Sequence, residues 1–348
     1  MMAGSSNASE DQWDRALTGP RPVPLYAGLA LLVALLFVAS LCIGPVFISP
    51  IKLIGLLSGN HGDVLSLIAW EIRLPRALLG LAVGGSLGLA GAALQGFLRN
   101  PLSEPGIIGV SGCAALGAVL AFYLGAAGAA HWILPASGIA GALISVAAIY
   151  ALAGRNASIL TIILAGVAIN SLAGALTTLV LSLSPNPFAT YEIFFWLLGS
   201  LSNRSFEHVT LIAPFIVCGW LLLLTTGRAL DALSLGEETA TSLGIDLVRT
   251  RAQIIVGTAL AVGSSVAVTG VVGFIGLVVP HLMRALVGQR PGALLGASTL
   301  GGAALTLAAD IGTRVPVVAG ELRLGVVTAL IGAPFFLYLV LRKRTVYQ

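Results

Sequence analysis

The sequence predicts an all-α integral membrane protein with about ten transmembrane helices. Of its 348 residues, 57% are hydrophobic and only 9% are charged, which is too little charge to cover a water-soluble domain. Runs of roughly twenty apolar residues recur along the chain, and inside a bilayer the backbone must satisfy its own hydrogen bonds. Barrel strands would alternate apolar and polar residues, and these runs do not. Helices are therefore the predicted spanning elements.

The predicted spans follow one another in a single domain. Residues 1–24 are polar and are expected to form a disordered cytoplasmic tail, and residues 25–345 are expected to form the membrane domain. Spans are expected at residues 25–46, 77–97, 107–124, 133–153, 159–183, 209–226, 252–272, 274–287, 293–311 and 326–341. The span at 274–287 is short and contains Pro280, so one crossing fewer or more remains an alternative.

The lysine and arginine residues predict the orientation. With both termini in the cytoplasm, most of the 18 basic residues lie inside, as the positive-inside rule favours for a multi-pass protein of the bacterial cytoplasmic membrane. The basic residues then left outside are Lys52, Arg73, Arg76, Arg204, Arg314 and Arg323. The net charge of +4 is spread over the loops, so it gives no indication of nucleic-acid binding.

A charged segment at residues 228–251 lies between two apolar spans. It has an apolar residue at about every third or fourth position and glycines at Gly236 and Gly244, a pattern that predicts two short helices at the cytoplasmic surface. Leucines among acids would offer a surface to another protein. The residues of these expected coupling helices, at about 231–246, are Asp231, Leu233, Leu235, Gly236, Glu237, Glu238, Leu243 and Gly244.

The chain contains no ATP-binding loop of its own. The phosphate-binding motif GxxxxGK[ST] needs a lysine after glycine, and Lys52 and Lys343 follow other residues. An ion-coupled carrier would be expected to bury carboxylates at mid-membrane, yet the acids map to loops and span ends. We therefore expect a separate ATPase to supply the energy and to hold the ATP and Mg²⁺, with no cofactor in this chain.

Two predicted spans carry stripes of small or polar residues. Gly80, Gly84 and Gly88 recur at four-residue spacing, which favours close helix packing over a transport role. In the span at 159–183 one stripe combines glycines with polar side chains, which suits either a hydrogen-bonded helix contact or the wall of a substrate path. That stripe consists of Gly166, Asn170, Gly174 and Thr177.

Other polar residues indicate structural roles. Asp310 and Arg314 are one helical turn apart and predict an ion pair. The three cysteines and four histidines show no metal-ligand or redox spacing, so no metal site is expected. No nucleophile and base cluster in the sequence, which argues against a membrane-embedded enzyme.

Six stretches, taken together, identify a resemblance to a known family. The chain resembles the FecCD or BtuC-like permease subunits of ABC importers for iron siderophores, haem and vitamin B12. The matching stretches are 73–76 (RLPR), 94–109 (LQGFLRNPLSEPGIIG), 233–244 (LSLGEETATSLG), 273–284 (GFIGLVVPHLMR), 308–314 (AADIGTR) and 325–337 (GVVTALIGAPFFL).

The resemblance implies a type II importer fold and a set of partners. It implies a homodimer with the path at its two-fold axis, two cytoplasmic ATPase subunits and a soluble periplasmic or extracellular binding protein. The cargo would be a bulky metal chelate, with a ferric siderophore favoured over haem or vitamin B12, and an ion-coupled secondary transporter is the remaining rival.

The resemblance also assigns residue roles. It implies that Arg73, Arg76 and Arg314 dock the binding protein and that 233–244 forms the coupling helices. For Asn170 and Thr177 it favours a position facing the substrate path over a helix contact. The residues that it places at the cytoplasmic gate are Asn100, Leu102, Ala157 and Ser158. One departure is Glu321-Leu322-Arg323, where the family commonly has Glu-Leu-Pro.

Overall fold

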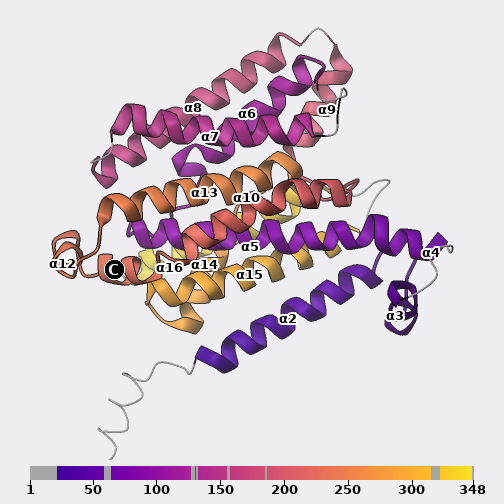
Figure 1. Ribbon diagram of the computed structural model, residues 1–348, viewed down its shortest axis with the longest axis horizontal. Coiled ribbons are helices and arrows are strands. Elements are labelled where there is room, and N and C mark those ends of the chain that lie inside the picture. Colours follow the sequence, from indigo (N-terminus) through magenta and orange to yellow (C-terminus); the bar gives the residue numbers. More distant parts are fainter. Residues whose placement is uncertain are drawn as a thin grey trace, which may run out of the picture.

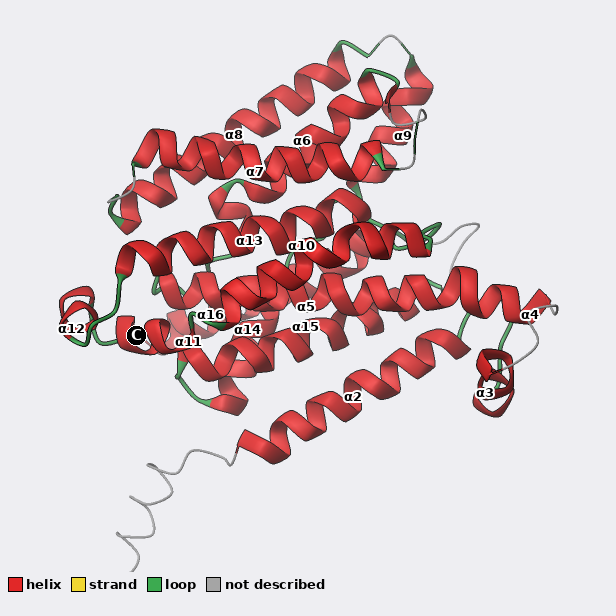
Figure 2. Ribbon diagram, in the orientation of Figure 1, coloured by secondary structure: helices red, strands yellow, loops and turns green. Residues whose placement is uncertain are grey.

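The structure, a computed structural model, describes residues 22–58, 64–126, 130, 132–154, 157–184, 186–314 and 322–346. The predicted N-terminal tail lies almost entirely outside these residues, as does Glu321. Every regular element in the described part of the chain is a helix (Figure 2), which confirms the predicted all-α fold.

The helices follow the chain in an order that matches the predicted spans. The elements are α2 (Pro22–Cys42), α3 (Pro50–Ser58), α4 (Val64–Leu67), η1 (Ile68–Arg73), α5 (Leu74–Phe97), η2 (Pro105–Ile108), α6 (Val110–Tyr123), α7 (Ile133–Ala153), α8 (Ile159–Ser182), α9 (Pro187–Leu197), α10 (Phe206–Leu224), α11 (Gly227–Leu233), α12 (Glu237–Ser242), α13 (Leu247–Thr269), α14 (Ile275–Val287), α15 (Pro291–Thr313) and α16 (Leu324–Val346).

Among the described residues, seven helices are long and apolar enough to cross a membrane. They are Val23–Cys42, Val64–Phe97, Ile133–Ala153, Ile159–Ser182, Phe206–Leu224, Leu247–Thr269 and Pro291–Thr313. Three shorter apolar helices, Val110–Tyr123, Ile275–Val287 and Leu324–Tyr338, coincide with the remaining predicted spans. Each predicted span therefore corresponds to one helix of the structure.

The helices form a central group and a flanking group (Figure 1). In the centre α5 contacts α13, α14 and α15, and α13 also contacts α7 and α10. The flanking group consists of α6, α7 and α8, and α2 lies on the opposite side against α15. The largest apolar core runs through this central group, with fully buried residues such as Leu89 on α5 and Ile254 on α13.

Helix α5 is longer than the sequence predicted. With α4 and η1 it forms one continuous helix of 34 residues, Val64–Phe97. At 1.5 Å per residue this helix is about 50 Å long, whereas a bilayer core is about 30 Å thick. The predicted start at residue 77 reflected the charges of Arg73 and Arg76, which end the apolar run but not the helix.

Glycines set the spacing between α5 and α15. A Cβ on Gly84 would lie 2.3 Å from the carbonyl oxygen of Gly302, and one on Gly88 would lie 2.0 Å from that of Ser298. Only hydrogen fits at these positions, so the two backbones approach as closely as small-residue interfaces allow. This confirms that the predicted glycine stripe is a packing surface.

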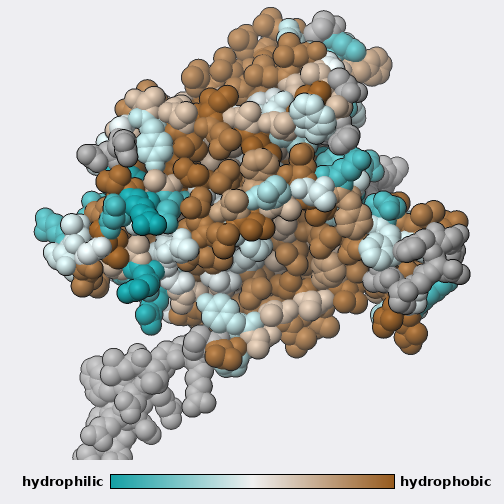
Figure 3. Space-filling view, in the orientation of Figure 1, coloured by the Kyte–Doolittle hydropathy of each residue, from teal (hydrophilic) through white to brown (hydrophobic). Residues whose placement is uncertain are grey.

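Polar residues gather at the two ends of the molecule. On the face shown in Figure 3, hydrophobic residues cover most of the middle, and hydrophilic residues collect over α12 and the start of α13 at one end and near the opposite end. A protein that spans a bilayer shows this distribution, because lipid offers polar groups no hydrogen-bond partners.

Candidate functional site

The charged segment at 228–251 contains the two predicted short helices, α11 and α12. Gly236 and Gly244 both adopt positive φ, of 114° and 81°. A side chain rarely tolerates this backbone conformation, whereas glycine adopts it at little cost. The two glycines therefore separate α11 from α12 and α12 from α13, as the sequence indicated.

The α11–α12 segment has an inner and an outer side. Leu233 is buried, and the Asp231 carboxylate accepts a hydrogen bond from the backbone N–H of Gly292 at 2.8 Å. In contrast, Leu235 is 66% exposed and Leu243 is 62% exposed. Of the predicted coupling residues, Asp231 and Leu233 thus hold the segment against the rest of the chain, whereas Leu235 and Leu243 remain accessible to a partner.

Helix α12 also approaches the turn that follows α5. An oxygen of Glu237 lies 3.7 Å from Nη2 of Arg99, which immediately precedes the predicted gate residue Asn100. A hollow of about 490 Å³ lies beside Glu237 and Glu238 on the same surface. The structure therefore places the predicted coupling surface next to one half of the predicted gate.

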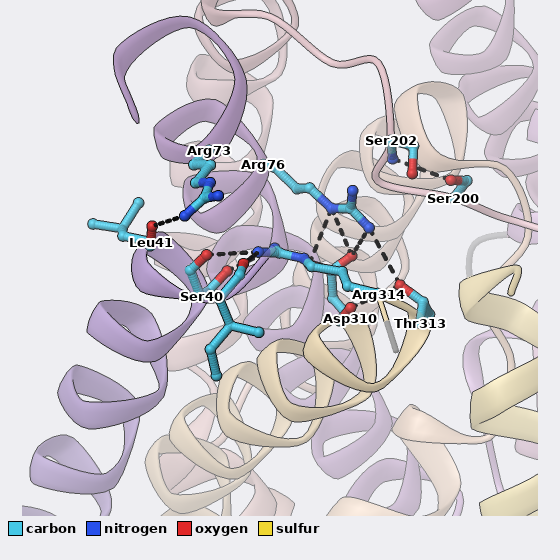
Figure 4. A network of polar contacts seen from close by, with 10 residues as sticks. Ser40, Leu41, Arg73, Arg76, Ser200, Ser202, Asp310, Thr313 and Arg314 are labelled. Atoms are coloured by element: carbon cyan, nitrogen blue, oxygen red, sulfur yellow. Dashed lines mark hydrogen bonds and ion pairs between the residues drawn. The ribbon is translucent and has the colours of Figure 1, made fainter. Parts of the chain in front are cut away.

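Three arginines and one aspartate form a buried network at the opposite end of the molecule (Figure 4). Nε of Arg76 donates to Asp310 Oδ1 at 2.9 Å, and its Nη2 donates to Thr313 Oγ1 at 3.2 Å. Arg314 also pairs with Asp310, which confirms the predicted ion pair one helical turn apart. With Asp310 only 1% exposed, its single negative charge lies between two buried guanidinium groups.

The same network holds the end of α2. Arg73 donates from Nη1 to the carbonyl oxygens of Leu41 at 2.7 Å and Cys42 at 2.8 Å, and Arg314 donates to the carbonyl oxygen of Ser40 at 2.6 Å. These carbonyls end a helix and have no partners within it. The arginines predicted to dock a binding protein are thus largely occupied by their own chain, and docking remains a prediction.

The glycine and polar stripe of α8 lies at the edge of the chain. Gly166 is buried, and a Cβ there would lie 2.4 Å from the carbonyl oxygen of Ile107. Gly174 has open space instead, and Thr177 donates to its own helix at Ala173 at 2.8 Å. The stripe therefore begins as a helix contact and continues as an open surface.

Asn170 lines a cavity of about 210 Å³ between α8 and the loop that precedes α6. Glu104 and Ser111 line the same cavity, and burial raises the pKa of Glu104 above its ordinary value. Sequence reasoning missed Glu104 as a site residue. The available signal was its position between Pro101 and Pro105, two residues that restrict the loop and fold it back against the helices.

The predicted gate residues lie in two separate turns. Asn100 Oδ1 accepts from the backbone N–H of Leu102 at 3.0 Å, while the Ser158 side chain caps α8 by accepting from the N–H of Thr161 at 3.1 Å. Ala157 is buried beside this cap. Each polar side chain stabilises its own turn, and their role as a gate remains a prediction.

Among the described residues, no three His, Cys, Asp or Glu side chains come together in a way that could hold a metal ion. The cysteines at 42, 113 and 218 are free thiols.

Comparison with known proteins gives consistent matches along most of the chain. The model of the FecCD transport family matches residues 31–342. The chain is 41% identical over 286 residues to the cobalamin import system permease protein BtuC of Halobacterium salinarum, covering 82% of this chain and 76% of that protein. It is 38% identical over 328 residues to the vitamin B12 import system permease protein BtuC of Salmonella paratyphi A, covering 93% and 96%.

Two further matches extend the comparison. An uncharacterised ABC transporter permease protein of Bacillus subtilis, YvrB, is 38% identical over 294 residues and covers 82% of each chain. A solved structure of a metal-chelate type ABC transporter in an inward-facing conformation superposes with a TM-score of 0.82 at 33% identity, over 92% of this chain and 99% of that chain.

Proposed function

Because this chain belongs to the FecCD transport family, we propose that it is the permease subunit of an ABC importer that takes a bulky metal chelate from a soluble binding protein into the cytoplasm. The observation that carries the proposal is the α11–α12 segment. Its leucines, 66% and 62% exposed at Leu235 and Leu243, lie at a polar end of a membrane protein, where lipid would not cover them.

The α11–α12 segment is suited to receive motion from a separate ATPase. Its inner side is fastened to α15 through Asp231 and Gly292, so a push on the exposed side would reach the helices rather than bend a loose loop. The ion pair between Glu237 and Arg99 gives a second route, to the turn that follows α5. ATP and Mg²⁺ would bind to that ATPase, two copies of which would serve the assembly.

The open face of α8 supports a homodimer with the substrate path at its axis. Leu164 and Leu172 are exposed, and so are the polar residues Asn170, Ser171 and Thr178. Lipid would satisfy the leucines but not the polar groups. A second copy facing α8 across a water-filled path would account for the exposed leucines and for the exposed polar residues. Gly174 and Thr177 would then lie on the path wall.

The binding protein would dock at the end that carries the arginine network. Arg73, Arg76 and Arg314 line a cavity of about 430 Å³, so their buried guanidinium groups still face a space that opens at the protein surface. Acidic side chains on the two lobes of a binding protein would enter such a positive cavity. This end would face outward, with both termini in the cytoplasm of a bacterial cell.

We propose a ferric siderophore as the first candidate cargo. Vitamin B12 is the second candidate, because the curated relatives of Halobacterium salinarum and Salmonella paratyphi A carry that function in their names. Haem is a third chelate of comparable size.

The test is uptake into proteoliposomes that contain this chain, its ATPase and its binding protein. The proposal expects uptake of one of the three chelates only when ATP and the ATPase are on the same side as α11 and α12. Uptake by the chain alone, driven by a proton or sodium gradient, would replace the proposal with an ion-coupled carrier.

A further inference from the structure

A second cavity at the arginine-bearing end has no role in the function described so far. It measures about 710 Å³ and lies between α9 and the segment that joins α9 to α10. We refer to it as the outer cavity. Its aromatic wall consists of Phe122, Phe188, Tyr191, Phe195 and Trp196.

Two arginines line the outer cavity without an ion pair to a described residue. Nε of Arg204 is buried and has no hydrogen-bond partner in the described part of the chain. Burial, and then the neighbouring charge of Arg323, lowers the pKa of Arg204 to about 10. The guanidinium carbon of Arg323 lies 5.1 Å from the centre of the Phe195 ring. The fold therefore holds two positive charges near each other, which requires a compensating interaction.

One acid, Glu192, also lines the outer cavity and is exposed to solvent. Arg323 additionally lines the neighbouring cavity that holds the arginine network, together with Ser202 and Asn203. The two cavities thus share a rim, and among the described residues that line them the arginines outnumber the acids. A concave surface with one dominant sign of charge attracts ligands of the opposite sign.

We propose that the outer cavity binds an anionic group, such as a carboxylate, on the chelate as it leaves the binding protein. This inference rests on the proposed function and adds a preference for negatively charged cargo. Arg204 and Arg323 would bind the anion by charge-assisted hydrogen bonds, which are the strong ones. The aromatic wall would contact a ring or other apolar part of the same ligand, and the hydroxyls of Ser200 and Thr269 would contact its polar edges.

A matched pair of chelates tests the preference for charge. Cyanocobalamin is neutral, and its monocarboxylic acid differs by hydrolysis of one propionamide side chain to propionate. Binding of each would be measured by calorimetry to the full-length chain in nanodiscs of phosphatidylcholine, without ATP or partners. The proposal expects about tenfold tighter binding of the monocarboxylic acid, and a smaller difference at high salt.

Single substitutions assign the preference to the outer cavity. Arg204→Gln and Arg323→Gln should each remove most of the tenfold difference, and Arg204→Lys should keep part of it. Glu192→Gln should increase it, because it removes a negative charge from the cavity wall. Lys52→Gln removes an exposed charge outside the cavity and should change nothing. The opposite signs expected for Arg204 and Glu192 separate an electrostatic effect from loss of folding.

Three outcomes would overturn the inference. These are equal binding of the two cobalamins, no binding of the monocarboxylic acid up to about 1 mM, or a preference that survives both arginine substitutions. Loss of the preference when phosphatidylglycerol is added to the nanodiscs would assign the cavity to a lipid headgroup and also overturn it. Since this binding needs no ATP, the result is independent of the uptake test, and either proposal can fail alone.

Discussion

Helices α5 and α8 have the same length, and each carries a glycine stripe, yet the chain uses them differently. Both have 24 residues, Leu74–Phe97 and Ile159–Ser182. Most of α5 is buried, and a Cβ on its Gly88 would lie 2.0 Å from a carbonyl oxygen of α15. Most of α8 is exposed, and nothing lies within 4 Å of a Cβ on its Gly174.

The same glycine spacing thus serves two different surfaces in these membrane helices. On α5 the stripe is flanked by apolar residues, and its purpose is close approach to another helix of the same chain. On α8 the stripe includes Asn170 and Thr177, and the chain leaves much of that face open. We interpret α5 as part of a fixed frame and α8 as the wall of a path.

The largest expected effect comes from the arginine network that joins α5 to α15. Asp310→Ala leaves Arg76 and Arg314 buried with no counter-charge, which should destabilise the fold by about 3 to 5 kcal/mol. Thermal unfolding of the purified chain in detergent should show this loss. Glu238→Ala, at an exposed acid of α12, is the control. Equal melting temperatures for the two variants would show that the network does not stabilise the frame.

The next effect is a direct contrast between the two glycine stripes. Gly88→Ala should destabilise by about 1 to 3 kcal/mol or more, because the new Cβ meets the backbone of α15. Gly174→Ala should be neutral or stabilise by up to about 1 kcal/mol, since alanine favours a helix and space is available. If both variants melted at the same temperature, the distinction between frame and path wall would be lost.

A smaller effect concerns the proposed ATPase surface on α11 and α12, which belongs to neither α5 nor α8. Leu235→Lys should weaken co-purification with the ATPase about tenfold, or about 1.4 kcal/mol, without changing the melting temperature. Leu322→Lys, at an exposed leucine far from α11 and α12, should leave that association intact. Equal ATPase binding by wild type and Leu235→Lys would refute the coupling assignment.

The smallest effect concerns Glu104 beside α8. Burial raises its pKa, so the folded chain binds the proton more tightly than the unfolded chain, and stability declines as the pH rises through the folded-state pKa. Glu104→Gln removes this decline. At pH 8 the melting temperature of the variant should exceed that of the wild type by up to about 3 °C, and near pH 4 the two melting temperatures should be equal. A lower melting temperature at pH 8 would contradict the stated environment of Glu104.

Much of this fold could be predicted from the sequence, because membrane spans depend on local composition. The glycine turns at Gly236 and Gly244 and the ion pair of Asp310 with Arg314 were likewise local patterns. The burial of Arg73 and Arg76 was not predictable, since it depends on α2 and α15, which are distant in the sequence. The aromatic residues of α9 are a local pattern, but the outer cavity also depends on Arg323, which meets the Phe195 ring from a distant part of the sequence.

The role of α8 as the wall of the path is tested by uptake through the reconstituted assembly with Asn170→Leu. Uptake is measured per folded chain, beside the melting temperature of the same variant. If α8 is the wall of the path, the melting temperature should stay the same, because an exposed side chain on a water-filled path contributes little to packing, while ATP-driven uptake should fall at least about tenfold. A lower melting temperature with unchanged uptake would show that Asn170 is a packing residue and would contradict the account.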